Sequence, residues 1–256
     1  EEVLRAFGVG YAPSAWDKIL VLGQQAGFSI PELRGVGLAQ RGRSGGEYDR
    51  FRSRIMFPIR DRRGRVLGFG GRAMRGDQGA KYVNTAETDF FHKSQLLYGV
   101  DRAKAAIAKA ARAVVVEGYT DVLALHQAGM PESVASMGTA LTEHQVRELA
   151  RVCGSGTLYL AFDADAAGEE AALRGMQMAE RTGMEVRVVS LPDGRDPADV
   201  AISDPDAFRT ALERSSGVLG FRIGRVLAAG GSRDQIYRRA ATVLGSAPPS
   251  VERDEQ

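Results

Sequence analysis

Two acidic clusters in the second half of the chain stand directly after apolar runs. Glu117 follows Val114-Val115-Val116, and Asp163 and Asp165 follow the run 158–162. In an open parallel sheet, ligands bind at the carboxyl ends of the strands, so these side chains are expected at one edge. Alternate residues of an extended chain point the same way about 6.5 Å apart, so Asp163 and Asp165 face one side. Two carboxylates held in this way repel each other unless a cation bridges them.

A third acidic cluster contains Asp193, Asp196 and Asp199, after a predicted strand that ends near Ser190. Carboxylates without nearby histidine or cysteine suit hard divalent ions such as Mg²⁺ or Mn²⁺, which prefer oxygen ligands. We therefore expect two or more such ions, about 3.5–4 Å apart, and phosphoryl-transfer chemistry. Because the chain has one cysteine, Cys153, and three histidines, it has no set of spaced ligands for zinc.

Structural alternatives stand beside these assignments. Asp121, four residues after Glu117, is either a supporting residue or the cap of the next helix. The pair Asp163 and Asp165 can also cap a helix that begins near Ala166. We interpret Asp193 as part of an Asp-Gly turn rather than as a metal ligand.

Charge is distributed unevenly along the chain. Residues 1–112 carry a balance of +9 and residues 113–256 a balance of −7, within an overall charge of +2. The first part is suited to phosphates and the second concentrates carboxylates, although basic residues can also simply coat a soluble surface. An apolar content of 44 % supports folded domains, and no run of about 18 apolar residues predicts a membrane span.

The first part of the chain mixes helix and strand. Ser14 is predicted to cap a helix that runs through Trp16, and residues 40–46 are predicted to form a polar, glycine-rich loop. Residues 54–61 and 66–72 read as two strands of a hairpin, joined by a turn at 62–64.

From residue 113, apolar strands alternate with amphipathic helices, which favours a parallel sheet with helices packed on it. The expected strands are 113–116, 133–136, 157–162 and 185–190. The expected helices are about 120–128, 142–152 and 166–182, followed by a wholly helical stretch at 205–245 and a frayed tail at 248–256. The chain is therefore predicted to divide into a basic part (1–112), a sheet domain (113–203) and a helical part (204–256).

The acidic motifs resemble a known signature. Glu117-Gly118-Tyr119-Thr120-Asp121, Asp163-x-Asp165-x-x-Gly168 and Asp196-Pro197 resemble the TOPRIM signature of DnaG-type primases, topoisomerases and some nucleases. The strings 54–61, 68–72, 81–88, 91–93 and 97–99 look like the basic subdomain of the DnaG-type RNA polymerase domain. The resemblance spans about Val3 to Leu244. It implies an α/β TOPRIM domain, a parallel sheet with helices on both faces, preceded by a mixed α+β basic subdomain and followed by a helical subdomain.

The resemblance implies roles for the acidic residues. Glu117, Asp163 and Asp165 are expected to be catalytic and, with Asp196, to serve the metals, with Asp121 in support. Glu117 is alternatively a general base on the primer 3′-hydroxyl. Many relatives have a second aspartate two residues after the aspartate of Asp-Pro, where this chain has Ala198, so Asp199 is a candidate substitute.

Residues of the basic part also acquire roles from the resemblance. Nucleotide phosphate is expected to bind at Arg72, Lys81, Asn84 and Lys93, and DNA at Arg54, Arg60 and Tyr82. Tyr82 either stacks on a base or packs in the core. We interpret His92, beside Phe91, as a structural histidine.

The implied function is DNA-directed RNA primer synthesis in the bacterial cytoplasm at the replication fork. Its ligands are a single-stranded DNA template, ribonucleoside triphosphates and the RNA primer, and pyrophosphate is released. Family members typically carry a zinc-binding domain and a domain that binds the replicative helicase; the chain is expected to be a core fragment without either. The alternatives are a non-catalytic TOPRIM scaffold that binds DNA and a TOPRIM metal-dependent nuclease.

Overall fold

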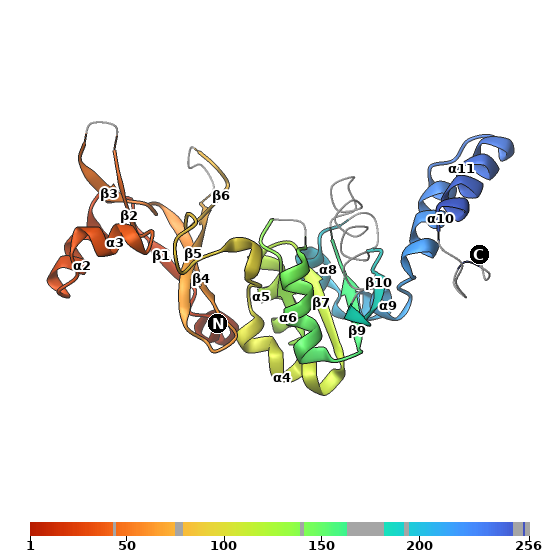
Figure 1. The fold of residues 1–256 in the computed structure, drawn as a ribbon, viewed down its shortest axis with the longest axis horizontal. Helices are drawn as coiled ribbons and strands as arrows, with labels where there is room; N and C mark the ends of the chain where they lie inside the picture. Colours follow the sequence, from red (N-terminus) through yellow and green to blue (C-terminus); the bar gives the residue numbers. More distant parts are fainter. Residues whose placement is uncertain are drawn as a thin grey trace. The chain divides into compact units, whose positions relative to one another are not determined.

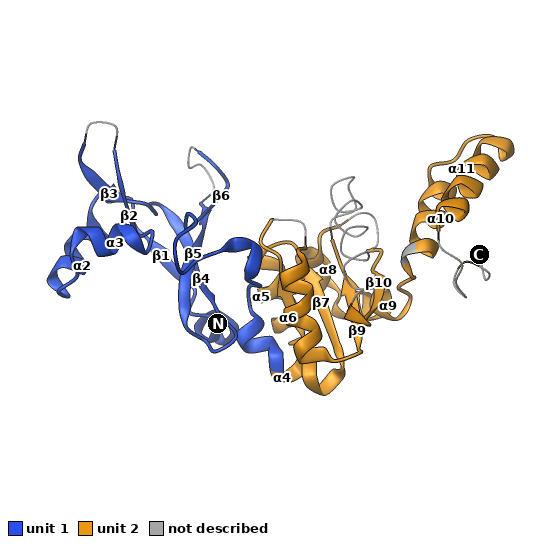
Figure 2. Cartoon of the chain, viewed as in Figure 1, with its two compact units in different colours: residues 1–104 blue, residues 105–256 orange. Residues whose placement is uncertain are grey.

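A computed structural model of the 256-residue chain describes residues 1–42, 45–74, 79–138, 141–162, 182–191, 195–247 and 253. The chain separates into two compact units, Glu1–Lys104 and Ala105–Gln256, which are coloured separately in Figure 2. Each unit has its own main sheet. The three-part division at residues 112 and 203 stays a prediction.

An antiparallel sheet in the order β1-β4-β5-β6 forms the centre of the first unit (Figure 1). Its strands are β1 (Gly10–Ala12), β4 (Arg54–Arg60), β5 (Val66–Ala73) and β6 (Tyr82–Asn84). The pairing of β4 with β5 confirms the predicted hairpin. In its turn, the Asp61 carboxylate accepts the backbone N–H groups of Arg63 and Arg65, each at 2.9 Å.

The core of the first unit covers one end of this sheet. Phe57, Phe91 and Tyr98 are buried, and the Tyr98 ring lies 5.6 Å from Phe7 and 6.3 Å from Phe57 between ring centroids. Gly68 leaves room for Phe91, because a Cβ atom at Gly68 would lie 2.5 Å from a carbon of that ring. Aromatic packing therefore fixes where the sheet is covered and where it is open.

Shorter elements complete the first unit. They are α1 (Glu2–Phe7), α2 (Lys18–Gln25), α3 (Ile30–Gly35), η1 (Lys93–Gln95) and the two-stranded pair β2 (Ala39–Arg41) and β3 (Glu47–Asp49). The prediction that Ser14 caps a helix was wrong, because α2 begins at Lys18 after Asp17. The prediction of a loop over 40–46 was wrong at its start, since Gln40 pairs with Tyr48 in β2–β3.

A parallel sheet in the order β10-β9-β7-β8 forms the centre of the second unit, after α4 (Val100–Ala110), which joins the two units. Its strands are β7 (Arg112–Val116), β8 (Ser133–Ala135), β9 (Thr157–Leu160) and β10 (Glu185–Val188), and every pairing is parallel. Residues 113–116 of the central strand β7 are fully buried. Each buried valine there contributes about 1.5–3 kcal/mol to folding. The predicted parallel sheet is confirmed.

Helices flank this sheet. They are α5 (Tyr119–Gln127), α6 (Glu143–Cys153), α8 (Pro197–Ser203), α9 (Pro205–Glu213), α10 (Val218–Ala228) and α11 (Arg233–Ser246). The Thr142 hydroxyl caps α6 by accepting the N–H of Gln145. The helix predicted over 166–182 lies, but for its last residue, outside the described residues, as does the predicted tail apart from residue 253.

The prediction of a wholly helical stretch at 205–245 was wrong, because the structure has three separate helices there. The stretch is interrupted before α10, where Ser216 forms an antiparallel bridge with Val188 at the end of β10. A second break before α11 contains Gly230 and Gly231, whose φ angles of 64° and 121° favour glycine. No helix within the described ranges is both long enough and apolar enough to cross a bilayer.

Candidate functional site

The carboxyl ends of β7 and β9 lie side by side. Val115 pairs with Leu160, and the N–H of Ala161 donates to the Val115 carbonyl at 2.9 Å. Glu117 and Phe162 each stand two residues past that pair, one on each chain segment. The parallel register therefore places Glu117 at the same sheet edge as the end of the described segment that follows β9.

Asp163 and Asp165 come directly after that segment but lie outside the described residues. Asp193, which we interpreted as a turn residue, also lies outside them. Among the residues that the structure describes, no three carboxylate, histidine or cysteine side chains stand together as a metal site. The convergence of Glu117 with the aspartate pair is consequently a proposal based on register.

The backbone around Glu117 is held by a strained loop. Glu117 is half-buried, and its carbonyl accepts the N–H of Gly138 at 3.2 Å. Met137 and Gly138, after β8, have φ angles of 64° and 73°. A non-glycine residue in this region costs on the order of 1 kcal/mol, and such strain concentrates at functional sites. The loop after β8 thus fixes the end of β7 beside the candidate site.

Two of the other predicted acidic residues act as helix caps. The Asp121 carboxylate accepts the N–H of Gly118 at 2.9 Å, at the start of α5. Asp196 accepts the N–H of Asp199 at 2.7 Å, at the start of α8. Both contacts stabilise a helix N-terminus, as expected for a negative charge there. The capping alternative for Asp121 is observed, and the role of Asp196 and the exposed Asp199 in metal binding stays a prediction.

In the first unit, strand pairing separates the predicted contacts onto two faces of the antiparallel sheet. Arg54 pairs with Ala73, and the backbone N–H of Ala73 donates to the Lys81 carbonyl at 2.9 Å. One residue away on each strand, Arg72 pairs with Tyr82. Because successive side chains along a strand point to opposite faces, Arg72 and Tyr82 lie on the face opposite to Arg54 and Lys81.

Tyr82 is a surface residue with cations beside it. It is 39 % exposed, so the alternative that it packs in the core was wrong. The guanidinium carbon of Arg72 lies 5.9 Å from the ring centroid, and the Nζ of Lys81 lies 5.8 Å from it. This geometry is suited to stacking on a base next to a phosphate.

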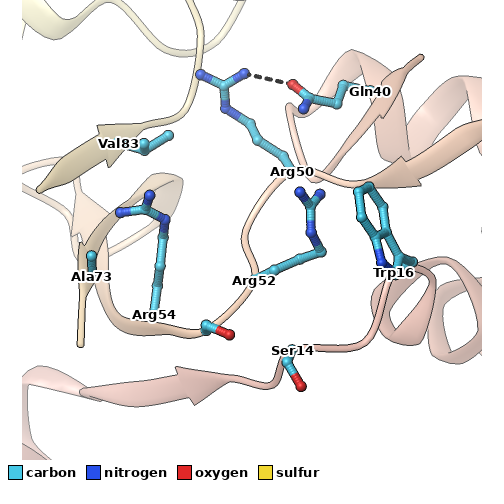
Figure 3. A pocket seen from close by; sticks show the side chains of 9 residues that line it. Ser14, Trp16, Gln40, Arg50, Arg52, Arg54, Ala73 and Val83 are labelled. Atoms are coloured by element: carbon cyan, nitrogen blue, oxygen red, sulfur yellow. Dashed lines mark hydrogen bonds between the residues drawn. The ribbon is translucent and has the colours of Figure 1, made fainter. Parts of the chain in front are cut away.

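The structure reveals a basic pocket that the sequence reasoning missed (Figure 3). This arginine pocket, about 340 Å³ in volume, is lined by Trp16, Arg50, Arg52 and Arg54 among others. Arg50 is held there because its Nε and Nη2 donate to the Asn84 carbonyl at 3.0 and 2.6 Å. The signal that could have identified it was the mixture of aromatic and basic residues in the segment Tyr48-Asp49-Arg50-Phe51-Arg52.

Trp16 and Arg52 form the stacked wall of the arginine pocket. The Arg52 guanidinium lies 4.0 Å from the Trp16 ring centroid and 4.9 Å from that of Tyr48. The backbone N–H of Asp49 donates to the Trp16 carbonyl at 2.7 Å. The buried Asp49 carboxylate in turn accepts two N–H groups at the start of α2. A remote carboxylate therefore fixes the segment that carries Trp16.

Arg60 does not join the arginine pocket. It lies at the other end of β4, six residues from Arg54, which is about 20 Å along an extended strand. Its Nη1 donates to the Gly64 carbonyl at 3.1 Å, and its Nε lies 4.0 Å from the Asp101 carboxylate. The structure thus gives Arg60 local partners at the hairpin turn.

Lys93 lies in a separate cluster. Burial lowers the pKa of the Lys93 ammonium, although the nearby Glu87 carboxylate opposes this effect. The backbone N–H of Lys93 donates to Glu87 at 3.0 Å and holds the pKa of that carboxyl below its usual value, with help from His92. The His92 Nδ1 lies 3.1 Å from Glu87, which is consistent with our structural interpretation of the histidine.

Comparison with known proteins matches both units. A family model described as the DNA primase catalytic core, N-terminal domain, matches residues 1–104, and a Toprim-like model matches residues 114–201. The DNA primase of Deinococcus radiodurans is 44 % identical over 87 % of this chain and 39 % of its own length. The chain spans between 34 and 41 % of the length of the first curated relatives it matches.

Solved structures match over nearly the whole chain. The RNA polymerase domain of Mycobacterium tuberculosis primase DnaG is 40 % identical, with a TM-score of 0.87 over 99 % of this chain and 84 % of that one. A DnaG primase catalytic domain bound to single-stranded DNA is 35 % identical, with a TM-score of 0.78 over 99 % and 81 %.

These matches define the class as an α/β catalytic core with a Toprim domain. The chain belongs to the family of DnaG-type primase catalytic cores.

Proposed function

We propose that this chain joins ribonucleoside triphosphates on a single-stranded DNA template, releases pyrophosphate and so makes RNA primers. The observation that carries this proposal is the register of β7 with β9, because it sets Glu117 at the edge where the chain enters Asp163 and Asp165. Membership of the primase family supports the same reaction. The relative solved with single-stranded DNA supports the choice of template.

Divalent ions are part of the proposal. Toprim primase domains are metal-dependent, and we assign Mg²⁺ or Mn²⁺, two or more ions, to Glu117, Asp163, Asp165 and Asp196. The fit rests on donor chemistry, because these four side chains offer only carboxylate oxygens, which hard ions prefer. When bound, the ions would neutralise the triphosphate and lower the pKa of the attacking hydroxyl. Asp121 and Asp199 are assigned supporting positions at the helix ends.

The remaining roles belong to the side chains of the first unit. Lys81 and Lys93 are proposed to bind nucleotide phosphate. Arg72 and Asn84, on the sheet face opposite to Lys81, are proposed to bind phosphate on that face. The arginine pocket, which includes Arg54, is proposed to bind the template through phosphate contacts and stacking, so binding should weaken steeply as salt rises. Glu117 is proposed alternatively to accept the proton of the primer 3′-hydroxyl at its carboxylate.

Ribonucleotide incorporation on single-stranded DNA tests the proposal. Asp163→Ala should lower the rate by about 100-fold or more, the loss typical when one key electrostatic group at a reaction centre is removed. Asp206→Ala is the matched control, because that carboxylate is an exposed partner of Arg209 in α9. Wild-type activity in Asp163→Ala would refute the metal assignment.

Product analysis separates the rival functions. A primase lengthens RNA and releases pyrophosphate, whereas a nuclease shortens the DNA. A scaffold gives neither product and shows no carboxylate-dependent uptake of manganese. Either of the last two outcomes would overturn the proposal.

A further inference from the structure

One row of side chains crosses the whole antiparallel sheet of the first unit. Tyr11 in β1 pairs with Ile55 in β4, Ile55 pairs with Arg72 in β5, and Arg72 pairs with Tyr82 in β6. Directly paired residues of antiparallel strands point to the same face. These four side chains, the tyrosine row, therefore form one line across the sheet.

The tyrosine row is the open end of its face. Further along the same face, Phe57 is buried and Phe91 packs over Gly68, so that end belongs to the core. At the row itself, Tyr11 is 59 % exposed and Tyr82 is 39 % exposed. Two aromatic rings thus stand at the surface on the two outer strands, where core packing does not account for them.

We propose that the tyrosine row is a second contact for single-stranded DNA, in which Tyr11 and Tyr82 each stack on a base and Arg72 binds a phosphate between them. Aromatic faces bind bases with little sequence preference, which suits a template of arbitrary sequence. The Arg72 guanidinium lies against the Tyr82 ring, so its charge is held where a strand stacked on that ring would pass. This inference rests on the template-binding part of the proposed function.

The spacing of the tyrosine row identifies a strand rather than a single nucleotide. Tyr11 and Tyr82 are three strand spacings apart, about 14 Å, at about 4.8 Å per spacing. One base cannot contact two rings that far apart. Bases stacked at the duplex rise of about 3.4 Å would need about four nucleotides to span the row, and an extended strand fewer. A single nucleoside triphosphate therefore cannot contact both tyrosine rings at once.

The tyrosine row and the arginine pocket differ in face and in chemistry. The pocket includes Arg54, Ala73 and Val83, which pair in positions that alternate with those of the row, so it opens on the opposite face. The pocket has three arginines, whereas the row has Arg72 alone. Loss of Tyr11 should consequently reduce affinity without changing its salt dependence, while loss of Arg52 should reduce the salt slope by about one unit.

The test measures binding of a dye-labelled oligodeoxythymidine to the full chain by fluorescence anisotropy, with no nucleotide or metal added. Tyr11→Ala should weaken binding about tenfold, the effect expected when a base-stacking aromatic is removed. Tyr11→Phe keeps the ring and should stay within about twofold of the parent. Tyr237→Ala is the matched control, because Tyr237 is a tyrosine 74 % exposed on α11, and it should bind as the parent does.

Two results would overturn the inference. One is equal DNA affinity for Tyr11→Ala and Tyr237→Ala, with thermal melting confirming that both variants are folded. The other is a loss of ribonucleoside triphosphate binding in Tyr11→Ala with DNA affinity intact. This test is independent of the proposed function. If the parent binds DNA through Tyr11 but makes no RNA, the primase proposal is refuted and the proposed DNA contact at the tyrosine row is still supported.

Discussion

Replacing Asp49 by alanine should destabilise the first unit far more than its position on a short strand suggests. Asp49 is 2 % exposed, and its carboxylate oxygens accept the N–H groups of Ile19 at 2.7 Å and Leu20 at 3.0 Å. Both donors belong to the first turn of α2, where N–H groups have no partner within the helix. Asp49 is therefore the cap of a helix that begins about thirty residues earlier.

The expected size follows from these two contacts. A hydrogen bond to a charged acceptor contributes about 1.5–3 kcal/mol, so Asp49→Ala should cost about 3 kcal/mol or more in the free energy of unfolding. With a denaturant slope of about 1.5 kcal/mol per molar for a unit of this size, the urea midpoint should fall by about 2 M.

Trp16 supplies the readout, because it is the only tryptophan of the chain and its carbonyl accepts the backbone N–H of Asp49. Its fluorescence during urea unfolding reports on the first unit. Asp17→Ala is the control, since Asp17 precedes α2 but makes no side-chain hydrogen bond to it. That variant should lose less than about 1 kcal/mol, the contribution of a surface charge near a helix end. Equal midpoints for the two variants would refute the reasoning.

Two further predictions concern one residue in each unit. Burial would raise the pKa of Asp61, but hydrogen bonds from Arg65 outweigh it and hold this pKa below its ordinary value. Asp61 therefore contributes stability above its unfolded-state pKa, near 4, that is lost as pH falls through the folded value, so the stability deficit of Asp61→Asn at neutral pH should shrink in acid. Urea midpoints over a pH series check this, and a constant deficit would contradict it. A Cβ at Gly156 would lie 2.0 Å from the carbonyl oxygen of Ala111, so Gly156→Ala should lose about 3 kcal/mol, whereas Gly245→Ala, with open space in α11, should gain about 0.5–1 kcal/mol. Thermal melting followed by circular dichroism compares the two, and a melting temperature in Gly156→Ala as high as the parent's would count against the clash.

Elements with local signals could be predicted from the sequence. β7 reads as a strand because four consecutive apolar residues precede an acidic turn, and it is the buried centre of the sheet. The start of α6 was predictable because Thr142 and Gln145 have the spacing of a capping pair. The edge position of Glu117 followed from the same logic, since a parallel strand has one carboxyl end.

Features that depend on distant residues could not be predicted. Ser14 is a residue type that often caps helices, but the N-terminus of α2 is capped by the buried carboxylate of Asp49, which lies in β3. The helix break before α10 is fixed by the bridge between Ser216 and Val188 of β10. A contact between residues this far apart leaves no sign in the helical periodicity of the sequence. The arginine pocket was missed because Trp16 and Arg52 are far apart in the sequence and come together where the Asp49 N–H donates to the Trp16 carbonyl.

During synthesis, β7 leaves the ribosome with both of its edges unpaired. β8 pairs with one edge of β7, but the other edge stays unpaired until β9 has been made, because the sheet order is β10-β9-β7-β8. At about 5–20 residues per second, the interval from Glu117 to Leu160 lasts about 2–9 s. An apolar, unprotected strand edge is a template for pairing with another chain. Nascent chains that stall before Thr157 therefore expose an unpaired edge of an apolar strand, and we expect them to aggregate more readily than the complete chain.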